Sequence, residues 1–122
     1  MTMMIEHVQL THPEAKTDAI RDFWTGVMGF EEVEKPPLLR DQVGGGWFRR
    51  DEAEVHIGID PDHHPMTIAH PAFMVDDLDA LSERLRANGH AVKWDERIPT
   101  RRRFFSFDPA GNRLEFFKNN ED

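Results

Sequence analysis

The sequence predicts an α+β fold built from two tandem βαβββ modules. Elements expected from the residue pattern run in the order β-α-β-β-β twice along the 122 residues. Three pairs of positions also recur at offsets of 59 to 63 residues: His7 with His70, Gly29 with Gly89, and His56 with Glu115. A repeat of about half the chain is the simplest account of both observations. We therefore expect a single domain over residues 1–122, with one module over about 3–60 and the other over about 66–118.

The first module is expected to contain a strand, a helix and three further strands. Residues 3–10 (MMIEHVQL) alternate between two faces, as strands do. From Pro13 to Val27 apolar residues recur at helical spacing, and Gly29 supplies a stop. The remaining strands are predicted at residues 30–33, 47–50 and 53–59, with a loop (KPPLLRDQVGGG) between the first two.

The second module repeats this order. Residues 67–75 (TIAHPAFMV) are expected to form a strand, and residues 76–89 (DDLDALSERLRANG) form a helix with acidic residues at its start and Asn-Gly at its end. Its leucines fall on one face, which can pack against a sheet. Further strands are predicted at residues 90–94, 102–107 and 113–118.

Composition and charge narrow the class of protein. Hydrophobic residues make up 39% and charged residues 31%, which is typical of a soluble globular domain. The formal net charge of −8 disfavours binding to nucleic acid or to an anionic membrane. No apolar run approaches the roughly 20 residues that span a bilayer. The start of the chain lacks the segments of an export signal, so we expect a cytoplasmic protein.

One basic cluster, Arg101 to Arg103, precedes two phenylalanines. It has two interpretations, a solvated loop that leads into a strand or a pocket for an anionic group of a substrate. The solvated loop is the default interpretation of so short a basic run.

Four side chains point to a metal centre. The chain has no cysteine, so any metal must bind to His, Asp or Glu. The first and last strands of each module carry one such residue on the face opposite the cleaner apolar set: His7, His56, His70 and Glu115. Three imidazoles and a carboxylate suit one divalent ion of Zn, Mn, Fe, Co or Ni. Glu54 shares a strand face with His56, so either residue could approach the ion.

Several segments resemble the vicinal oxygen chelate superfamily, which includes glyoxalase I, bleomycin-resistance proteins and type I extradiol dioxygenases. They are IEHVQL, EVHIGID, AHPAFMVDDLDAL and RRFFSFDPAGNRLEFF, which together cover nearly the whole chain. The resemblance implies that the two modules form a cupped mixed sheet around a divalent metal, with the helices on the outer face. It also implies a homodimer, and metal ligands at His7, His70 and Glu115, with His56 at the fourth position.

The sequence departs from the glyoxalase I pattern at His56, where that enzyme usually has a carboxylate. Our leading hypothesis is a metal-dependent enzyme, a glyoxalase-like lyase or isomerase or a dioxygenase, which binds a small substrate through two neighbouring oxygens and stabilises an oxyanion. Glu115 would be both ligand and base, and His56 or Glu54 the second acid–base group. Candidate substrate-binding residues are Trp47, Arg49, Arg103 and Phe105.

The competing hypothesis is a binding protein without catalytic activity that sequesters a drug-like compound in the same cup, as bleomycin-resistance proteins do. The acidic charge is compatible with a cationic compound. Stoichiometric metal would favour the enzyme, and tight binding of a bulky ligand by metal-free protein would favour sequestration.

Overall fold

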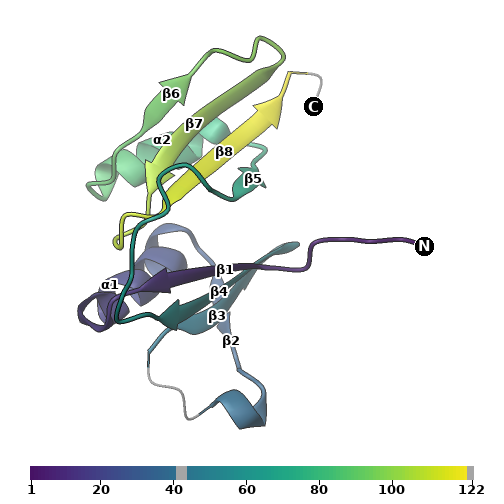
Figure 1. Cartoon of the computed structure of the whole chain (residues 1–122). Coiled ribbons are helices and arrows are strands. Elements are labelled where there is room, and N and C mark those ends of the chain that lie inside the picture. The colour runs from purple at the N-terminus through teal and green to yellow at the C-terminus, as the bar shows by residue number, and fades with distance from the viewer. Residues whose placement is uncertain (41–43, 121–122) are drawn as a thin grey trace. The chain divides into compact units, whose positions relative to one another are not determined.

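The computed structural model describes residues 1–40 and 44–120 and divides into two compact units, Met1–His64 and Pro65–Asp122. Each unit has a helical segment and its own four-stranded mixed sheet (Figure 1). The order β-α-β-β-β is found in both, which confirms the predicted α+β class. Residues 41–43 of the loop expected before residue 47 lie outside the described residues.

In the first unit the sheet has the order β1-β4-β3-β2. Its strands are β1 (Val8–His12), β2 (Glu31–Val33), β3 (Gly46–Arg50) and β4 (Ala53–Ile59). β1 pairs with β4 in parallel, and the other pairs are antiparallel. A short 3₁₀ turn, η3 (Pro37–Leu39), lies between β2 and β3.

The helix predicted from Pro13 to Val27 is present, but its hydrogen-bonding pattern changes along its length. It consists of the 3₁₀ turn η1 (Glu14–Lys16), α1 (Thr17–Asp22) and the π-helical turn η2 (Phe23–Val27). In the wide π turn the Met28 N–H donates to the Phe23 carbonyl at 2.8 Å. Both Phe23 and its neighbour Trp24 in this turn are buried.

The first strand begins later than predicted. Residues 3–7 belong to no strand of this unit, because only Val8–His12 pairs with β4. They extend from the unit as an arm (Figure 1), and the side chains of Met3, Met4 and Ile5 are exposed. His7 therefore lies just before β1 rather than within it.

In the second unit the sheet has the order β5-β8-β7-β6, again with one parallel pair, β5 with β8. Its elements are β5 (Ala72–Met74), α2 (Leu78–Ala87), β6 (Lys93–Asp95), β7 (Arg101–Phe107) and β8 (Arg113–Asn119). The Asp77 side chain caps α2 by accepting from the Ala80 N–H at 3.0 Å. Gly89 follows the helix at a φ of 83°, which confirms the predicted stop.

Two expectations for this unit are corrected. The predicted strand over residues 67–75 contracts to β5, so His70 precedes it, separated by Pro71, which has no N–H to donate to a ladder. Arg101, Arg102 and Arg103 lie inside β7, paired with β8, so the interpretation as a solvated loop is wrong.

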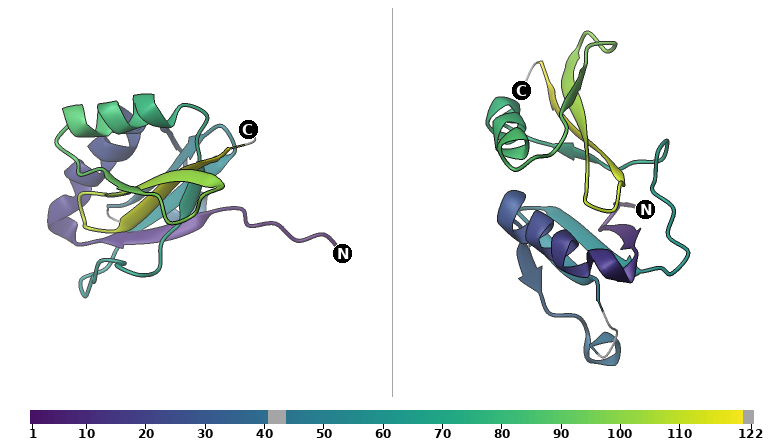
Figure 2. Two further views of the ribbon diagram at one scale, coloured as in Figure 1. Left: turned by 90° about the horizontal axis from the view of Figure 1, so that it is seen from above. Right: turned by 90° about the vertical axis from the view of Figure 1, so that its left-hand side faces the viewer.

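Each unit has its own core on the helix side of its sheet. In both views of Figure 2 the helical segment of each unit lies along one face of that unit's sheet. The buried apolar residues of the second unit include Leu78, Leu85, Phe104, Leu114 and Phe116. Because side chains alternate along a strand, the residues between them, such as Glu115, fall on the opposite face. None of the described helices is long and apolar enough to cross a membrane.

Candidate functional site

In the first unit His56 lies between two other rings. Trp47 faces it across the β3–β4 ladder, with ring centroids 3.8 Å apart and planes within 2°. His7 covers its other side, also at 3.8 Å and with 19° between the planes. The side chain of His56 is 4% exposed, whereas that of His7 is 37% exposed. The strand ladder therefore fixes His56, and the chain before β1 adds His7.

A carboxylate contacts the edge of the His56 ring. Nε2 of His56 donates to Oε1 of Glu54 at 3.2 Å, and an Arg49 guanidinium N–H lies 3.4 Å from the same oxygen. The hydrogen bond from His56, assisted by the positive charge of Arg49, holds the pKa of the Glu54 carboxyl below its usual value. Glu54 and His56 thus form a hydrogen-bonded pair on one strand face, as the sequence pattern allowed.

The stacked geometry bears on metal binding. A ring nitrogen binds an ion through a lone pair that lies in the ring plane. The nearly parallel planes of His7 and His56 do not direct two lone pairs toward one point. As a pair of ligands for one ion these two rings do not fit, although either ring alone is a suitable donor.

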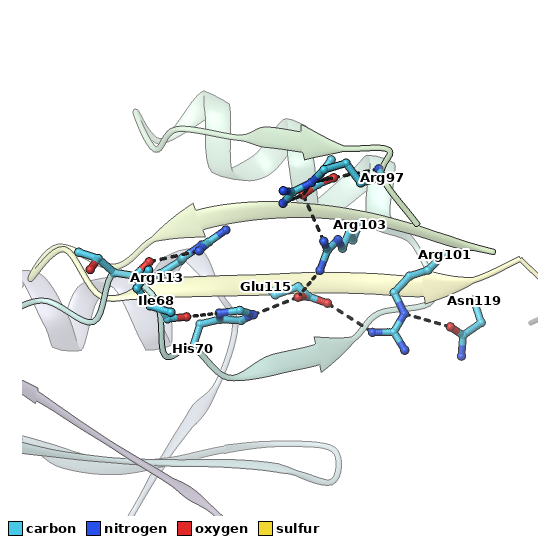
Figure 3. A network of polar contacts seen from close by, with 10 residues as sticks. Ile68, His70, Arg97, Arg101, Arg103, Arg113, Glu115 and Asn119 are labelled. Carbon is cyan, nitrogen blue, oxygen red and sulfur yellow. Dashed lines mark hydrogen bonds and ion pairs between the residues drawn. The ribbon is translucent and has the colours of Figure 1, made fainter. Parts of the chain in front are cut away.

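In the second unit His70 and Glu115 meet (Figure 3). Nε2 of His70 lies 3.1 Å from Oε1 of Glu115, whose side chain is 4% exposed. On the other side of the imidazole, Nδ1 donates to the Ile68 carbonyl at 2.8 Å. Phe105 holds the ring edge-on, with centroids 5.4 Å apart.

This pair passes a test for metal binding. Because Nδ1 donates to the Ile68 carbonyl, the other ring nitrogen, Nε2, is the one left to bind an ion, and it lies on the side of the Glu115 carboxylate. A ring N–H donated to a carbonyl is the usual outer contact of a metal-binding histidine. One N and one O donor at 3.1 Å can share an ion that binds each at about 2.0–2.2 Å.

Two arginines on β7 also contact the Glu115 carboxylate. Arg103 Nη1 donates to Oε1 at 3.0 Å, and Arg101 Nη1 lies 3.5 Å from Oε2. Figure 3 shows both side chains pointing from β7 toward Glu115. The negative charge of this carboxylate is therefore balanced without a metal.

Arg103 also bridges to a second acid, Asp95. Its Nη2 donates to Oδ2 of Asp95 at 3.2 Å. Hydrogen bonds from Arg97, together with the charge of Arg103, hold the pKa of Asp95 well below its usual range. Arg103 is thus fixed between two carboxylates that lie on the same face of the sheet.

Sequence reasoning singled out some of these residues and missed others. Trp47, Arg49, Arg103 and Phe105 all lie on the sheet faces that carry His56 or Glu115. Asp95 on β6 and Arg113 on β8 were missed, although the alternation of charged and aromatic residues in these strands was a usable signal. Among the residues that the structure describes, no group of three or more His, Asp or Glu side chains is gathered in a geometry that could hold a metal.

Two βαβββ units with His and Glu on the sheet faces opposite their helices define a class of paired-module proteins. The model of the Glyoxalase/Bleomycin resistance protein/Dioxygenase superfamily matches residues 5–116, and the chain belongs to this superfamily.

Solved structures extend this comparison. A glyoxalase family protein from Bacillus anthracis is 37% identical, with a TM-score of 0.91 and 98% of each chain covered. TnmS3, an antibiotic binding protein from Streptomyces sp. CB03234, is 25% identical, with a TM-score of 0.68 and 98% of this chain and 100% of that chain covered. The fosfomycin resistance protein FosX from Listeria monocytogenes shares the fold, with 18% identity, a TM-score of 0.79 and coverage of 99% and 95%. No curated protein matches the chain.

Proposed function

We propose that this protein is a metal-dependent enzyme that acts on a small oxygenated substrate by chelating it through two oxygens. The observation that carries the proposal is the contact of 3.1 Å between His70 Nε2 and Glu115 Oε1, with the far nitrogen of the ring held by the Ile68 carbonyl. Such a pair is suited to one divalent ion of Fe, Mn, Ni, Co or Zn.

His70 and Glu115 would supply two ligands, and one ring of the His7–His56 stack the third. We assign that ligand to His7, because His56 is held by Trp47 and by Glu54. When bound, a divalent ion would supply Lewis-acid polarisation of the two substrate oxygens, worth several kcal/mol. Three protein ligands are typical of a catalytic site that keeps a position open.

The other steps fall to the chain's own residues. Glu115 is the base that removes a substrate proton, and Arg101 and Arg103 hold its carboxylate in place. His56 is the second acid–base group, because its Nε2–H and Glu54 are within hydrogen-bonding distance. Trp47, Arg49 and Phe105 would contact the substrate.

The reaction class follows from family resemblance, as a lyase or isomerase of the glyoxalase type or a dioxygenase. We also propose that the protein is cytoplasmic and, as the resemblance implies, a homodimer. Light scattering at micromolar concentration tests the dimer, and a purely monomeric protein would contradict it.

A second candidate function is sequestration of a drug-like compound without catalysis. The specific observation in its favour is that both oxygens of Glu115 already have guanidinium partners, so the site is electrostatically balanced without a metal. The similarity to TnmS3, an antibiotic binding protein, also favours sequestration.

Metal uptake separates the two candidates. Metal-depleted protein is titrated calorimetrically with Mn, Fe, Co, Ni and Zn, and the loaded protein is analysed for its metal content. Binding of one equivalent of metal per chain that is lost in His70→Ala and kept in His64→Ala supports the enzyme. His64 serves as the control because it is an exposed histidine at the end of the first unit. No stoichiometric uptake of any metal supports sequestration.

A further inference from the structure

The face of the second sheet that carries Glu115 is basic, although the protein is acidic. Strand alternation and register place six charged side chains on it, the basic Lys93, Arg101, Arg103 and Arg113 and the acidic Asp95 and Glu115. The formal charge of the face is therefore +2, in a protein of −8. The corresponding face of the first sheet has one basic residue, Arg49, and two acidic ones, Glu31 and Glu54.

Neutralising Glu115 and Asp95 does not account for this excess. Asp95 already has Arg97 as a partner, so Arg103 is not needed for its charge balance. Glu115 is contacted by two guanidinium groups where one would balance it. At least one positive charge beside Glu115 is left without a counter-charge.

The two arginines also keep hydrogen-bond donors free. Arg101 uses Nε for Asn119 and Nη1 for Glu115, which leaves Nη2 without a partner among the described residues. Arg103 donates from Nη1 to Glu115 and from Nη2 to Asp95, and its buried Nε has no partner among the described residues. A guanidinium carries five N–H donors in a fixed plane, which suits two-point recognition of an oxyanion.

Aromatic rings hold these groups in position. The guanidinium carbon of Arg101 lies 4.0 Å from the centroid of Phe117, and that of Arg103 lies 5.0 Å from the centroid of Phe105. Arg113 covers the same Phe105 ring at 3.9 Å. Because the side chains are already ordered, less conformational entropy is lost when a ligand binds.

The two guanidinium groups differ in how accessible they are. The side chain of Arg101 is 33% exposed and accessible, whereas that of Arg103 is 13% exposed.

We propose that Arg101 and Arg103 bind an anionic oxyacid group of the ligand, a carboxylate or a phosphonate or phosphate, next to Glu115. The inference rests on the proposed function, because it assumes that the anionic group belongs to the same molecule that the proposed enzyme chelates beside Glu115. A polyanion is not the ligand, because residues 1–64 carry 13 acidic and 6 basic residues and would repel it.

The test uses methylphosphonate and acetate as probes and the neutral dimethyl ester of methylphosphonate as the uncharged control. Binding to the full-length, metal-depleted protein is followed by the chemical shifts of its amide and arginine side-chain groups. We expect saturable binding of both anions and none of the ester. Arg101→Gln should weaken binding roughly tenfold, because a charge-assisted contact is lost.

The arginine triplet provides the matched control. Arg102 points to the helix side of β7, where it pairs with Asp79 at 3.1 Å, so Arg102→Gln should change the affinity less than about twofold. Arg101, as the more exposed residue, keeps the test valid if an Arg103 variant fails to fold. Equal losses in the Arg101 and Arg102 variants, or no saturable binding of either anion, would overturn the proposal.

The result is independent of metal uptake. Anion binding without metal uptake would support this inference and contradict the metal-dependent enzyme. Metal uptake without anion binding would contradict this inference alone.

Discussion

The imidazole of His70 and the carboxylate of Glu115 lie 3.1 Å apart although 45 residues separate them in the sequence. The contact forms because β5 pairs in parallel with β8, which brings Ala72 opposite Glu115. His70, two residues before Ala72, reaches the carboxylate from the edge of the sheet, and its far nitrogen is held by Ile68. A single strand pairing thus assembles the two donors on which the proposed chemistry depends.

Glu115→Gln tests whether this carboxylate is a base as well as a ligand. An amide cannot accept the substrate proton, so we expect roughly 10²-fold or more of the rate to stay missing when metal is added to saturation. Turnover is measured once a substrate is found, with Glu52→Gln, in an exposed turn, as the control. Near-normal turnover by metal-loaded Glu115→Gln would shift the role to His56 or Glu54.

The core of the second unit is tested by a pair of leucines. Leu85 on α2 is 0% exposed, and Leu38 in η3 is 96% exposed. Leu85→Ala leaves a cavity and should lower the free energy of unfolding by about 2–5 kcal/mol. Leu38→Ala should stay within about 0.5 kcal/mol of the parent in the same urea titration. Similar losses for both would mean that α2 does not pack as described.

The turn before β8 is tested at Gly111. Its φ is 83°, and an added Cβ would lie 3.2 Å from Pro65 atoms, so Gly111→Ala should destabilise the fold by about 1–2 kcal/mol. Gly26 lies in the helical segment with no atom within 4 Å of an added Cβ. Gly26→Ala should be neutral or stabilising by up to about 1 kcal/mol. Thermal unfolding of the two variants, measured in parallel, tests this prediction. Stabilisation of the fold by Gly111→Ala would contradict it.

The Asp95 contacts predict a pH dependence of stability. Arg97 and Arg103 lower the pKa of Asp95 in the folded state below its ordinary value of 3.8. Its ionised form therefore stabilises the fold above that pH, and this contribution is lost as the pH falls further. The free energy of unfolding of Asp95→Asn should be below that of the parent at about pH 7, and the gap should narrow toward about pH 3.

The matched control for this pH series is Asp62→Asn, at an exposed position in the loop after β4. It should follow the parent protein over the whole pH range. A gap for Asp95→Asn that stays constant with pH would show that the loss has another cause than the charge of Asp95.

The sequence by itself determined the repeated βαβββ order, the α2 helix with its stop at Gly89, and the sheet face on which Glu115, Arg103 and Phe105 lie. These features follow from the spacing of apolar residues and from the position of glycine, both of which can be read from a single segment of the chain. The tertiary structure decided the start of β1 at Val8, because a strand extends only as far as its partner pairs with it.

Tertiary structure also decided which side chains touch. Strand alternation places His56 on a face, but only the arrangement of the chain before β1 stacks His7 on it and turns the two lone pairs apart. Likewise, the bridge from Asp95 through Arg103 to Glu115 depends on the register of β6 and β8 against β7. Such contacts join residues far apart in sequence, and their distances are fixed by strand pairing and packing rather than by local preference.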